Sequence, residues 1–395
     1  MRNELSPAGK RVAVIGGGIS GMAVAYYLSR RHMVWLFEKE PRLGGSTHFA
    51  TIFNRAADTN LAKLLGELGV SVQPCAMSMS VFSPSDGFEY SSRGAAGFFA
   101  RWRNLASPAH YRLLADIRRF RLLTPGAAAG LTLAAYLNRE GFDPAFHQRF
   151  LYPLASAIWR MPMDSIGGFP AVTLIRYVAP LLKHPAEWRM VAGGVATCAA
   201  ELTAPYRDRV VTQARIAAVA RGESGVTLSF EDRAAMAFDE VVLGVPGDCV
   251  LPLLANPLGA EKDVFRGFTT SRNGVLLHTD ATLIPRRRLA RAAVNYLLRP
   301  DGGGAVTYDL SRLQDGPARY LTINGADLIG EGKVIDKFVH AYPRLTPEAV
   351  AAQGRWGEVS GRGRIHYCGA YWIYGFMEDG VKSAMRVARA LGVGC

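Results

Sequence analysis

A glycine-rich run near the amino end of the chain has the residue types and spacing that hold a phosphate group. The run reads GGGISG over 16–21 and fits the pattern GxGxxG. In that pattern Gly16 makes a tight turn, Gly18 lets the backbone approach a pyrophosphate, and Gly21 lets a helix pack close to its strand. The N–H groups at the start of the helix carry a partial positive charge that favours an anion. The residues of this run that are expected to form the dinucleotide-binding site are Gly16, Gly18, Ile19, Ser20 and Gly21.

A carboxylate follows at a distance that suits a ribose. Glu38 ends an apolar stretch at 33–38 and comes 17 residues after Gly21. A carboxylate at this place accepts hydrogen bonds from a pair of ribose hydroxyls and repels a 2′-phosphate. The apolar, β-branched stretch at 11–15 predicts a first buried strand, and 19–30 has a helical pattern. The first 40 residues therefore predict a βαβ unit that binds a dinucleotide.

The order of the remaining patterns indicates two domains. Helical patterns dominate from 98 to 182, strand patterns return at 209–245, and a strand, a glycine turn and a helix close the chain at 364–391. The simplest packing is a dinucleotide-binding domain made of separated segments, with a second domain inserted between them. The expected ranges are 1–70, 190–260 and 360–395 for the dinucleotide-binding domain, and 71–189 and 261–359 for the substrate domain.

Two further motifs carry a resemblance to a known superfamily. RLGGST at 42–47 directly follows the acid, and CGA at 368–370 precedes GFMEDG at 375–380. In these motifs the sequence resembles the flavin amine-oxidase superfamily. The resemblance implies FAD as cofactor and an α/β fold, with a Rossmann-type, amine-oxidase-like FAD-binding domain and an inserted α+β substrate domain. It also implies FAD contacts at Glu38, Lys39, Arg42, Gly44, Gly45, Ser46, Thr47, Ile216, Gly369, Ala370, Phe376, Met377 and Glu378.

Longer segments narrow the resemblance. The segments 151–159, 188–195, 276–288 and 368–383 resemble a bacterial branch of predicted NAD/FAD-binding proteins associated with modification of cyclopropane and methylated fatty acids. This implies a lipid acyl substrate, oxidised or desaturated by hydride transfer from a C–H bond to flavin N5. The chain departs from the branch in a shorter loop after Gly45 and in a Met at 377 where relatives have a His.

No catalytic side chain can be assigned from the sequence. Trp372 and Tyr374 are candidates to line a substrate pocket, although both also fit ordinary core packing. No nucleophile elbow and no His or Cys pair with metal-ligand spacing is present in the sequence, so no metal is expected. The alternatives are an amine oxidase, a carotenoid- or porphyrin-type desaturase, and a non-catalytic flavin- or nucleotide-binding protein with a degenerate site.

The charge balance indicates an anionic partner. The 395 residues include 46 Lys and Arg against 33 Asp and Glu, a formal net charge of +13. Aromatic and arginine residues interleave at 97–121, which fits either a helix at an anionic membrane surface or, as we favour, a helix with a solvated basic face. No nucleic-acid-binding module is visible. Five scattered cysteines, without a signal peptide or a long uncharged apolar run, predict a cytoplasmic protein with possible membrane association.

Overall fold

The computed structural model describes residues 9–45, 51–313 and 316–395. The chain forms two compact units. Unit 1 contains Met1–Gln73, Met190–Thr270 and Pro343–Cys395, and unit 2 contains Pro74–Arg189 and Ser271–Tyr342. The chain leaves unit 1 within β4 (Val72–Pro74) and re-enters it within β7 (Trp188–Val191). It leaves again within β13 (Thr270–His278) and returns within β17 (Val334–Pro343). The mixed α/β class expected from the sequence is confirmed.

Unit 1 is built on a parallel sheet of five strands in the order β18-β12-β1-β2-β8. In this sheet Ile15 pairs with Phe37 and Leu243, so three strands end at the same edge. The strands are β1 (Arg11–Ile15), β2 (Met33–Phe37), β8 (Val210–Val211), β12 (Glu240–Leu243) and β18 (Ile365–Tyr367).

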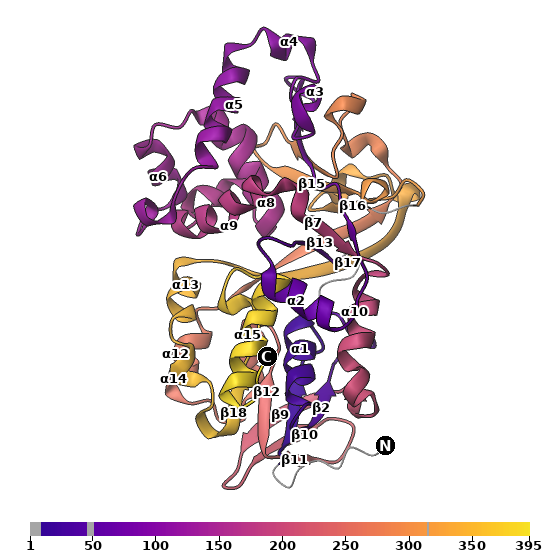
Figure 1. The fold of residues 1–395 in the computed structure, drawn as a ribbon, viewed down its shortest axis with the longest axis vertical. Helices are drawn as coiled ribbons and strands as arrows, with labels where there is room; N and C mark the ends of the chain where they lie inside the picture. Colours follow the sequence, from indigo (N-terminus) through magenta and orange to yellow (C-terminus); the bar gives the residue numbers. More distant parts are fainter. Residues whose placement is uncertain (1–8, 46–50, 314–315) are drawn as a thin grey trace. The chain divides into compact units, whose positions relative to one another are not determined.

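Both faces of this sheet are covered, which explains why its strands are continuously apolar. Val12 and Val14 point to one core, and the alternate residues Ala13 and Ile15 point to another. Helices cover the first face, and α1 and α15 lie side by side on it (Figure 1). These helices are α1 (Ile19–Leu28), α2 (Thr59–Glu67), α10 (Gly194–Thr203) and α15 (Met377–Ala390). The first and last segments of the chain therefore share one core.

An antiparallel sheet and short helices cover the second face. The sheet has the order β11-β10-β9, and its apolar residues share the core of Ala13 and Ile15. Its strands are β9 (Ile216–Arg221), β10 (Val226–Phe230) and β11 (Met236–Phe238). The helices are α11 (Val250–Leu253), α12 (Gly259–Phe265), α13 (Pro347–Gln353) and α14 (Trp356–Val359), and β3 (Ile52–Asn54) is a further strand of this unit.

The boundaries of the units differ from those expected from the sequence in three places. The structure assigns 71–73, 261–270 and 343–359 to unit 1, whereas the sequence placed them in the substrate domain. Phe265, Ala352 and Val359 are buried in the same core as β1, which gives the physical reason for this correction. An apolar helix face in the sequence does not by itself show which sheet it will cover.

Unit 2 combines a mixed sheet of seven strands with a set of helices. The sheet has the order β17-β13-β16-β15-β14-β5-β6, in which β14 pairs parallel with β5. The strands are β5 (Met79–Ser83), β6 (Phe88–Ser91), β13 (Thr270–His278), β14 (Val294–Leu298), β15 (Gly304–Asp309), β16 (Tyr320–Ile323) and β17 (Val334–Pro343). The helices are α3 (Gly94–Phe98), α4 (Trp102–Leu105), α5 (Pro108–Phe120), α6 (Leu133–Arg139), α7 (Pro144–Phe146), α8 (Tyr152–Trp159) and α9 (Ala171–Lys183).

The aromatic and basic stretch at 97–121 is divided among α3, α4 and α5 rather than forming one helix. Ser107 and Pro108 explain the last break, because the Ser107 hydroxyl accepts a hydrogen bond from the His110 N–H and Pro108 occupies the first helical position. In the described part of the chain, no helix combines the length and the apolar character that crossing a bilayer requires.

Candidate functional site

The glycine-rich loop lies at the carboxyl edge of the parallel sheet and packs tightly on itself. Gly16 has φ +107°, and a Cβ atom added there would lie 2.5 Å from the Gly244 carbonyl oxygen. A Cβ atom at Gly21 would lie 1.9 Å from the Gly16 carbonyl oxygen. These two positions need glycine for the packing of the chain itself. Gly244 directly follows β12, and the sequence analysis missed it, although a glycine after a predicted strand was a usable signal.

Gly18 differs from its neighbours because the described residues do not fill the space in front of it. Its backbone is extended, with φ −75° and ψ 176°, and it precedes the first turn of α1. A Cβ atom added at Gly18 would have no atom of the described residues within 4 Å. Ile19 and Ser20 begin α1, whose first N–H groups have no intrahelical acceptor. This combination of open space and free N–H groups suits a phosphate group.

The carboxylate of Glu38 is held against this loop. Glu38 is 7% exposed, and its Oε2 accepts a hydrogen bond of 2.6 Å from the Gly17 N–H. Its Oε1 accepts a hydrogen bond of 2.9 Å from the Glu40 N–H. The Ala214 N–H donates to the Glu38 carbonyl at 2.8 Å, and the Ile216 N–H donates to the Ala214 carbonyl. The structure thus brings Ile216 close to the chain around Glu38. The contact of Ile216 with FAD, which the resemblance implies, stays a prediction.

The turn that follows Arg42 packs on the glycine-rich loop. The Gly44 N–H donates to the Gly17 carbonyl at 2.9 Å. Gly45 has φ +59°, and a Cβ atom there would lie 3.1 Å from the Cα of Gly18. This close approach explains the glycine pair. Of the other predicted contacts on this turn, the side chains of Lys39 and Arg42 are exposed, and Ser46 and Thr47 lie outside the described residues.

The carboxyl-terminal motif is brought to the same edge of the sheet. The Gly369 N–H donates to the Ser383 hydroxyl at 3.0 Å, and Ala370 begins the turn that leads to α15. A Cβ atom at Gly380 would lie 2.7 Å from the Ser20 Oγ. The first turns of α1 and α15 are therefore in contact, as the adjacent helices in Figure 1 show. Segments from the two ends of the sequence form one site.

Comparisons with known proteins agree with this geometry. Residues 11–171 match the family model described as DAO, FAD-dependent oxidoreductase. The fold is similar to that of a CLA-producing fatty acid isomerase from P. acnes, with a TM-score of 0.73, 16% identity, and coverage of 97% of this chain and 99% of that chain. It is also similar to cyclohexylamine oxidase from Brevibacterium oxydans IH-35A, with a TM-score of 0.66, 15% identity, and coverage of 97% and 100%.

A short stretch also matches a curated protein. Over 54 residues the chain is 46% identical to bilirubin reductase of Mediterraneibacter gnavus, which is 13% of this chain and 8% of that protein. The chain thus spans only a small part of this relative.

The fold is that of the flavin amine oxidases, and the cofactor is FAD. The match to the FAD-dependent oxidoreductase model covers residues 11–171, and the similarity of fold extends over 97% of the chain. The residues fit this group. The space in front of Gly18 and the N–H groups of α1 suit the pyrophosphate, and the Glu38 carboxylate suits the ribose hydroxyls.

One predicted flavin contact has a different partner. The Glu378 side chain is almost fully buried, and its oxygens accept hydrogen bonds of 2.7 Å from the Asn60 side chain and from the Leu61 N–H. It also pairs with Lys382 at 3.2 Å. The carboxylate therefore caps the start of α2, and the contact of Glu378 with FAD stays a prediction. The sequence analysis missed this role because Asn60 and Glu378 are 318 residues apart.

The next carboxylate shapes the turn before α15. Asp379 is 2% exposed, and its Oδ2 accepts hydrogen bonds from the N–H groups of Phe376, at 3.0 Å, and Tyr374, at 3.2 Å. Burial raises the pKa of Asp379 to about 7, although these two hydrogen bonds act in the opposite direction. Asp379 thus determines the course of the chain where the flavin motif passes into α15.

The two candidate pocket residues have different surroundings. Trp372 is 4% exposed and lies in an aromatic cluster, with its ring 4.9 Å from Phe268 and 5.8 Å from Phe265 between centroids. This is the core of unit 1, so the core-packing interpretation holds for Trp372. Tyr374 is half-buried, as are Phe376 and Met377, and these three belong to the turn before α15. Only Tyr374 therefore keeps the exposure that a pocket residue needs.

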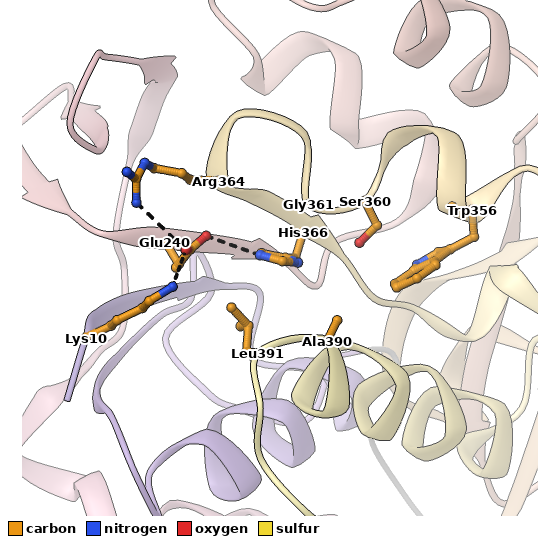
Figure 2. Close-up of a pocket in the computed structure, with 10 residues that line it drawn as sticks. Lys10, Glu240, Trp356, Ser360, Gly361, Arg364, His366, Ala390 and Leu391 are labelled. Carbon is orange, nitrogen blue, oxygen red and sulfur yellow. Dashed lines mark hydrogen bonds and ion pairs between the residues drawn. The ribbon is translucent and has the colours of Figure 1, made fainter. Parts of the chain in front are cut away.

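A pocket of about 470 Å³ lies elsewhere in unit 1, at the amino ends of the strands (Figure 2). Glu240, the first residue of β12, accepts a hydrogen bond of 2.7 Å from Lys10 and lies 3.2 Å from the His366 ring nitrogen Nε2. Arg364 lies at 4.0 Å. The glycine-rich loop at 16–21 and the motif at 368–380 both follow the carboxyl ends of the strands, at the opposite edge of the sheet. This pocket is therefore not the flavin site.

The charged residues of this pocket stabilise one another. Burial alone would raise the pKa of Glu240, but hydrogen bonds from His366 and Lys10 outweigh burial and lower the pKa to about 2. The cluster joins the amino ends of β1, β12 and β18. The sequence analysis did not single out these residues, because Glu240 and His366 are 126 positions apart and no local spacing signals their contact.

Proposed function

We propose that this chain catalyses the FAD-dependent two-electron oxidation of a lipid acyl chain, such as a methylated or cyclopropane fatty acid. Two kinds of observation support the proposal. The carboxylates of the flavin motif are committed to backbone N–H groups, and the structurally similar protein with the TM-score of 0.73 is a fatty acid isomerase.

The described residues would bind FAD by three elements. The loop at 16–21 and the first turn of α1 receive the pyrophosphate, and Glu38 receives the ribose. The start of α15 presents its partial positive charge at the same edge of the sheet, which favours negative charge on a flavin placed there. Bound FAD would supply the chemistry, because its N5 would accept a hydride from a substrate carbon, and the proton lost from the neighbouring carbon would pass to solvent.

The single observation on which the proposed reaction type rests is the hydrogen bonding of the carboxylates at 369–380. Glu378 and Asp379 are the carboxylates of this segment, and both accept backbone hydrogen bonds. Tyr374, Phe376 and Met377 offer aromatic and apolar surface instead. Such a turn suits an uncharged hydrocarbon whose oxidation begins by direct loss of hydride, and it does not favour a reaction that starts with proton abstraction by a carboxylate.

The experiment is anaerobic mixing of the FAD-loaded protein with two panels of substrates. One panel contains phospholipids with unsaturated, methylated or cyclopropane acyl chains, and the other contains putrescine and cyclohexylamine. We expect the flavin absorbance near its usual visible bands to bleach with a member of the acyl panel, and mass spectrometry of the extracted lipid to show the loss of two hydrogens. Bleaching with the amines alone would replace the proposal by amine oxidation. No bleaching with either panel would refute the proposal in favour of a non-catalytic flavin protein.

A further inference from the structure

Large apolar side chains are exposed at one end of unit 2, beside arginines. The side chains and their exposed fractions are Trp102 with 71%, Leu105 with 56%, Leu289 with 54% and Tyr111 with 47%. We call these four residues, together with Arg93, Arg103, Arg286 and Arg288, the α4 surface. A Trp and two Leu residues exposed to this extent on neighbouring elements are unusual unless the surface binds something.

Contacts around β6 bring these residues together although they come from distant segments. The Asn104 side chain of α4 donates to the Glu89 carbonyl at 3.2 Å, and the Glu89 carboxylate pairs with Arg287 at 2.6 Å. The Ser91 hydroxyl donates to the Leu289 carbonyl at 2.9 Å. β6 therefore holds α4 on one side and the turn at 286–291 next to it.

The helices complete the same end of the unit. The Tyr111 hydroxyl donates to the Leu105 carbonyl at 3.0 Å, which ties the start of α5 to the end of α4. Figure 1 shows α3 and α4 together at one end of α5. Leu122, which is 76% exposed, follows the other end of this 13-residue helix and so lies about 20 Å away along its axis.

The charge of these segments has one sign. The stretches 92–112 and 285–291 each contain four arginines and no Asp or Glu. The guanidinium of Arg103 lies 5.5 Å from the centroid of the Trp102 ring, so a cation and an exposed aromatic ring share one place. In the α4 surface, Trp102 prefers the headgroup region of a bilayer and the leucines prefer its acyl region. The arginines attract lipid phosphates.

We propose that the α4 surface docks on an anionic lipid bilayer. Trp102, Leu105 and Leu289 enter the headgroup region, and the arginines contact lipid phosphates. Nucleic acid explains the arginines but not the exposed leucines. This docking is independent of the substrate proposal, because it concerns unit 2 alone and needs no turnover.

The first test is co-sedimentation of the FAD-loaded full chain with vesicles of phosphatidylcholine alone and with vesicles containing one quarter phosphatidylglycerol. We expect binding to the second kind only, with a steep decrease at high salt. The variant R286Q/R288Q should bind at least about tenfold more weakly, since each arginine near the surface contributes on the order of fivefold. The double variant W102S/L289S should lose binding to a similar extent.

The controls are matched in exposure and in charge. L122S removes a leucine that is exposed but lies outside the α4 surface, and R266Q/R362Q removes two exposed arginines of unit 1. Both controls should bind like the unchanged protein. Equal losses in R266Q/R362Q and R286Q/R288Q would show general attraction of a basic protein and overturn the proposal, as would absence of binding to the anionic vesicles.

Fluorescence quenching separates insertion from surface attraction. Lipids brominated in the acyl chain should quench tryptophan emission on binding, and the W102F variant should lose most of this quenching while it still binds. Unchanged quenching in W102F would overturn the docking geometry. A short RNA is also added at an equal concentration as a competitor. If the RNA displaces the protein from the vesicles, and the same variants bind RNA weakly, the surface is reassigned to nucleic acid.

Discussion

Replacing Gly18 by alanine separates the binding of FAD from the folding of the chain. The added Cβ atom meets no atom of residues 9–45, 51–313 or 316–395 within 4 Å, and the backbone of Gly18 is in a region that any residue adopts. In the protein without cofactor, Gly18→Ala should therefore change the free energy of unfolding by less than about 1 kcal/mol, the cost of a poorer residue before the first turn of a helix.

The effect on FAD should be larger, because the open space in front of Gly18 is where we place the pyrophosphate. An added methyl group in a well-packed contact costs about 1–3 kcal/mol. That range corresponds to a dissociation constant about 5- to 150-fold higher. The assay is titration of the cofactor-free protein with FAD, followed by flavin fluorescence, alongside urea unfolding of the same sample.

Two matched glycines make the result interpretable. A Cβ atom at Gly21 would lie 1.9 Å from the Gly16 carbonyl oxygen, so Gly21→Ala should destabilise the chain by about 2 kcal/mol or more, with or without FAD. Gly66 of α2 has open space around its Cβ position, and Gly66→Ala should raise the stability by up to about 1 kcal/mol and leave FAD affinity unchanged. If Gly18→Ala binds FAD as tightly as the unchanged protein, the assignment of this loop to the pyrophosphate is wrong.

Three further substitutions test the acids of unit 1. Glu378→Ala leaves the N–H groups at the start of α2 without their acceptor, so the free energy of urea unfolding should fall by about 1–3 kcal/mol, whereas a loss of FAD affinity at unchanged stability would restore the predicted flavin contact. The pKa of Glu240 is lowered from 4.5 to about 2, so the contribution of Glu240 to the free energy of unfolding is present above pH 4.5 and is lost as the pH falls toward 2. Glu240→Gln should reduce the change in the free energy of unfolding over this pH range by about 1–2 kcal/mol, after allowance for solvent screening. An unchanged slope would contradict the ion-pair cluster. The pKa of Asp379 is raised from 3.8 to about 7, so the free energy of unfolding should fall as the pH rises between these values. Asp379→Asn should remove that decrease. If the Asn variant is less stable than the original protein at pH 8, the turn needs the charged form of Asp379.

Several features of unit 1 followed from the sequence because their signals are local. The glycine spacing at 16–21, the acid at Glu38 and the turn at 42–45 specify strand, loop, helix and strand within 45 residues. The structure confirms the parallel sheet and the meeting of the first and last segments. A steric requirement such as that of Gly21 is visible in sequence because the atoms that would clash belong to the same short loop.

Only the tertiary structure decided which long-range partners the remaining residues have. The sequence could not show that Glu378 caps α2, that Trp372 lies in an aromatic core, or that 343–359 covers the Rossmann sheet. Likewise, Trp102 and Leu289 are both exposed beside β6 although 187 positions separate them. The physical reason is that local patterns define the apolar face or charge of a segment, whereas the closest packing of all segments determines what that face or charge finally meets.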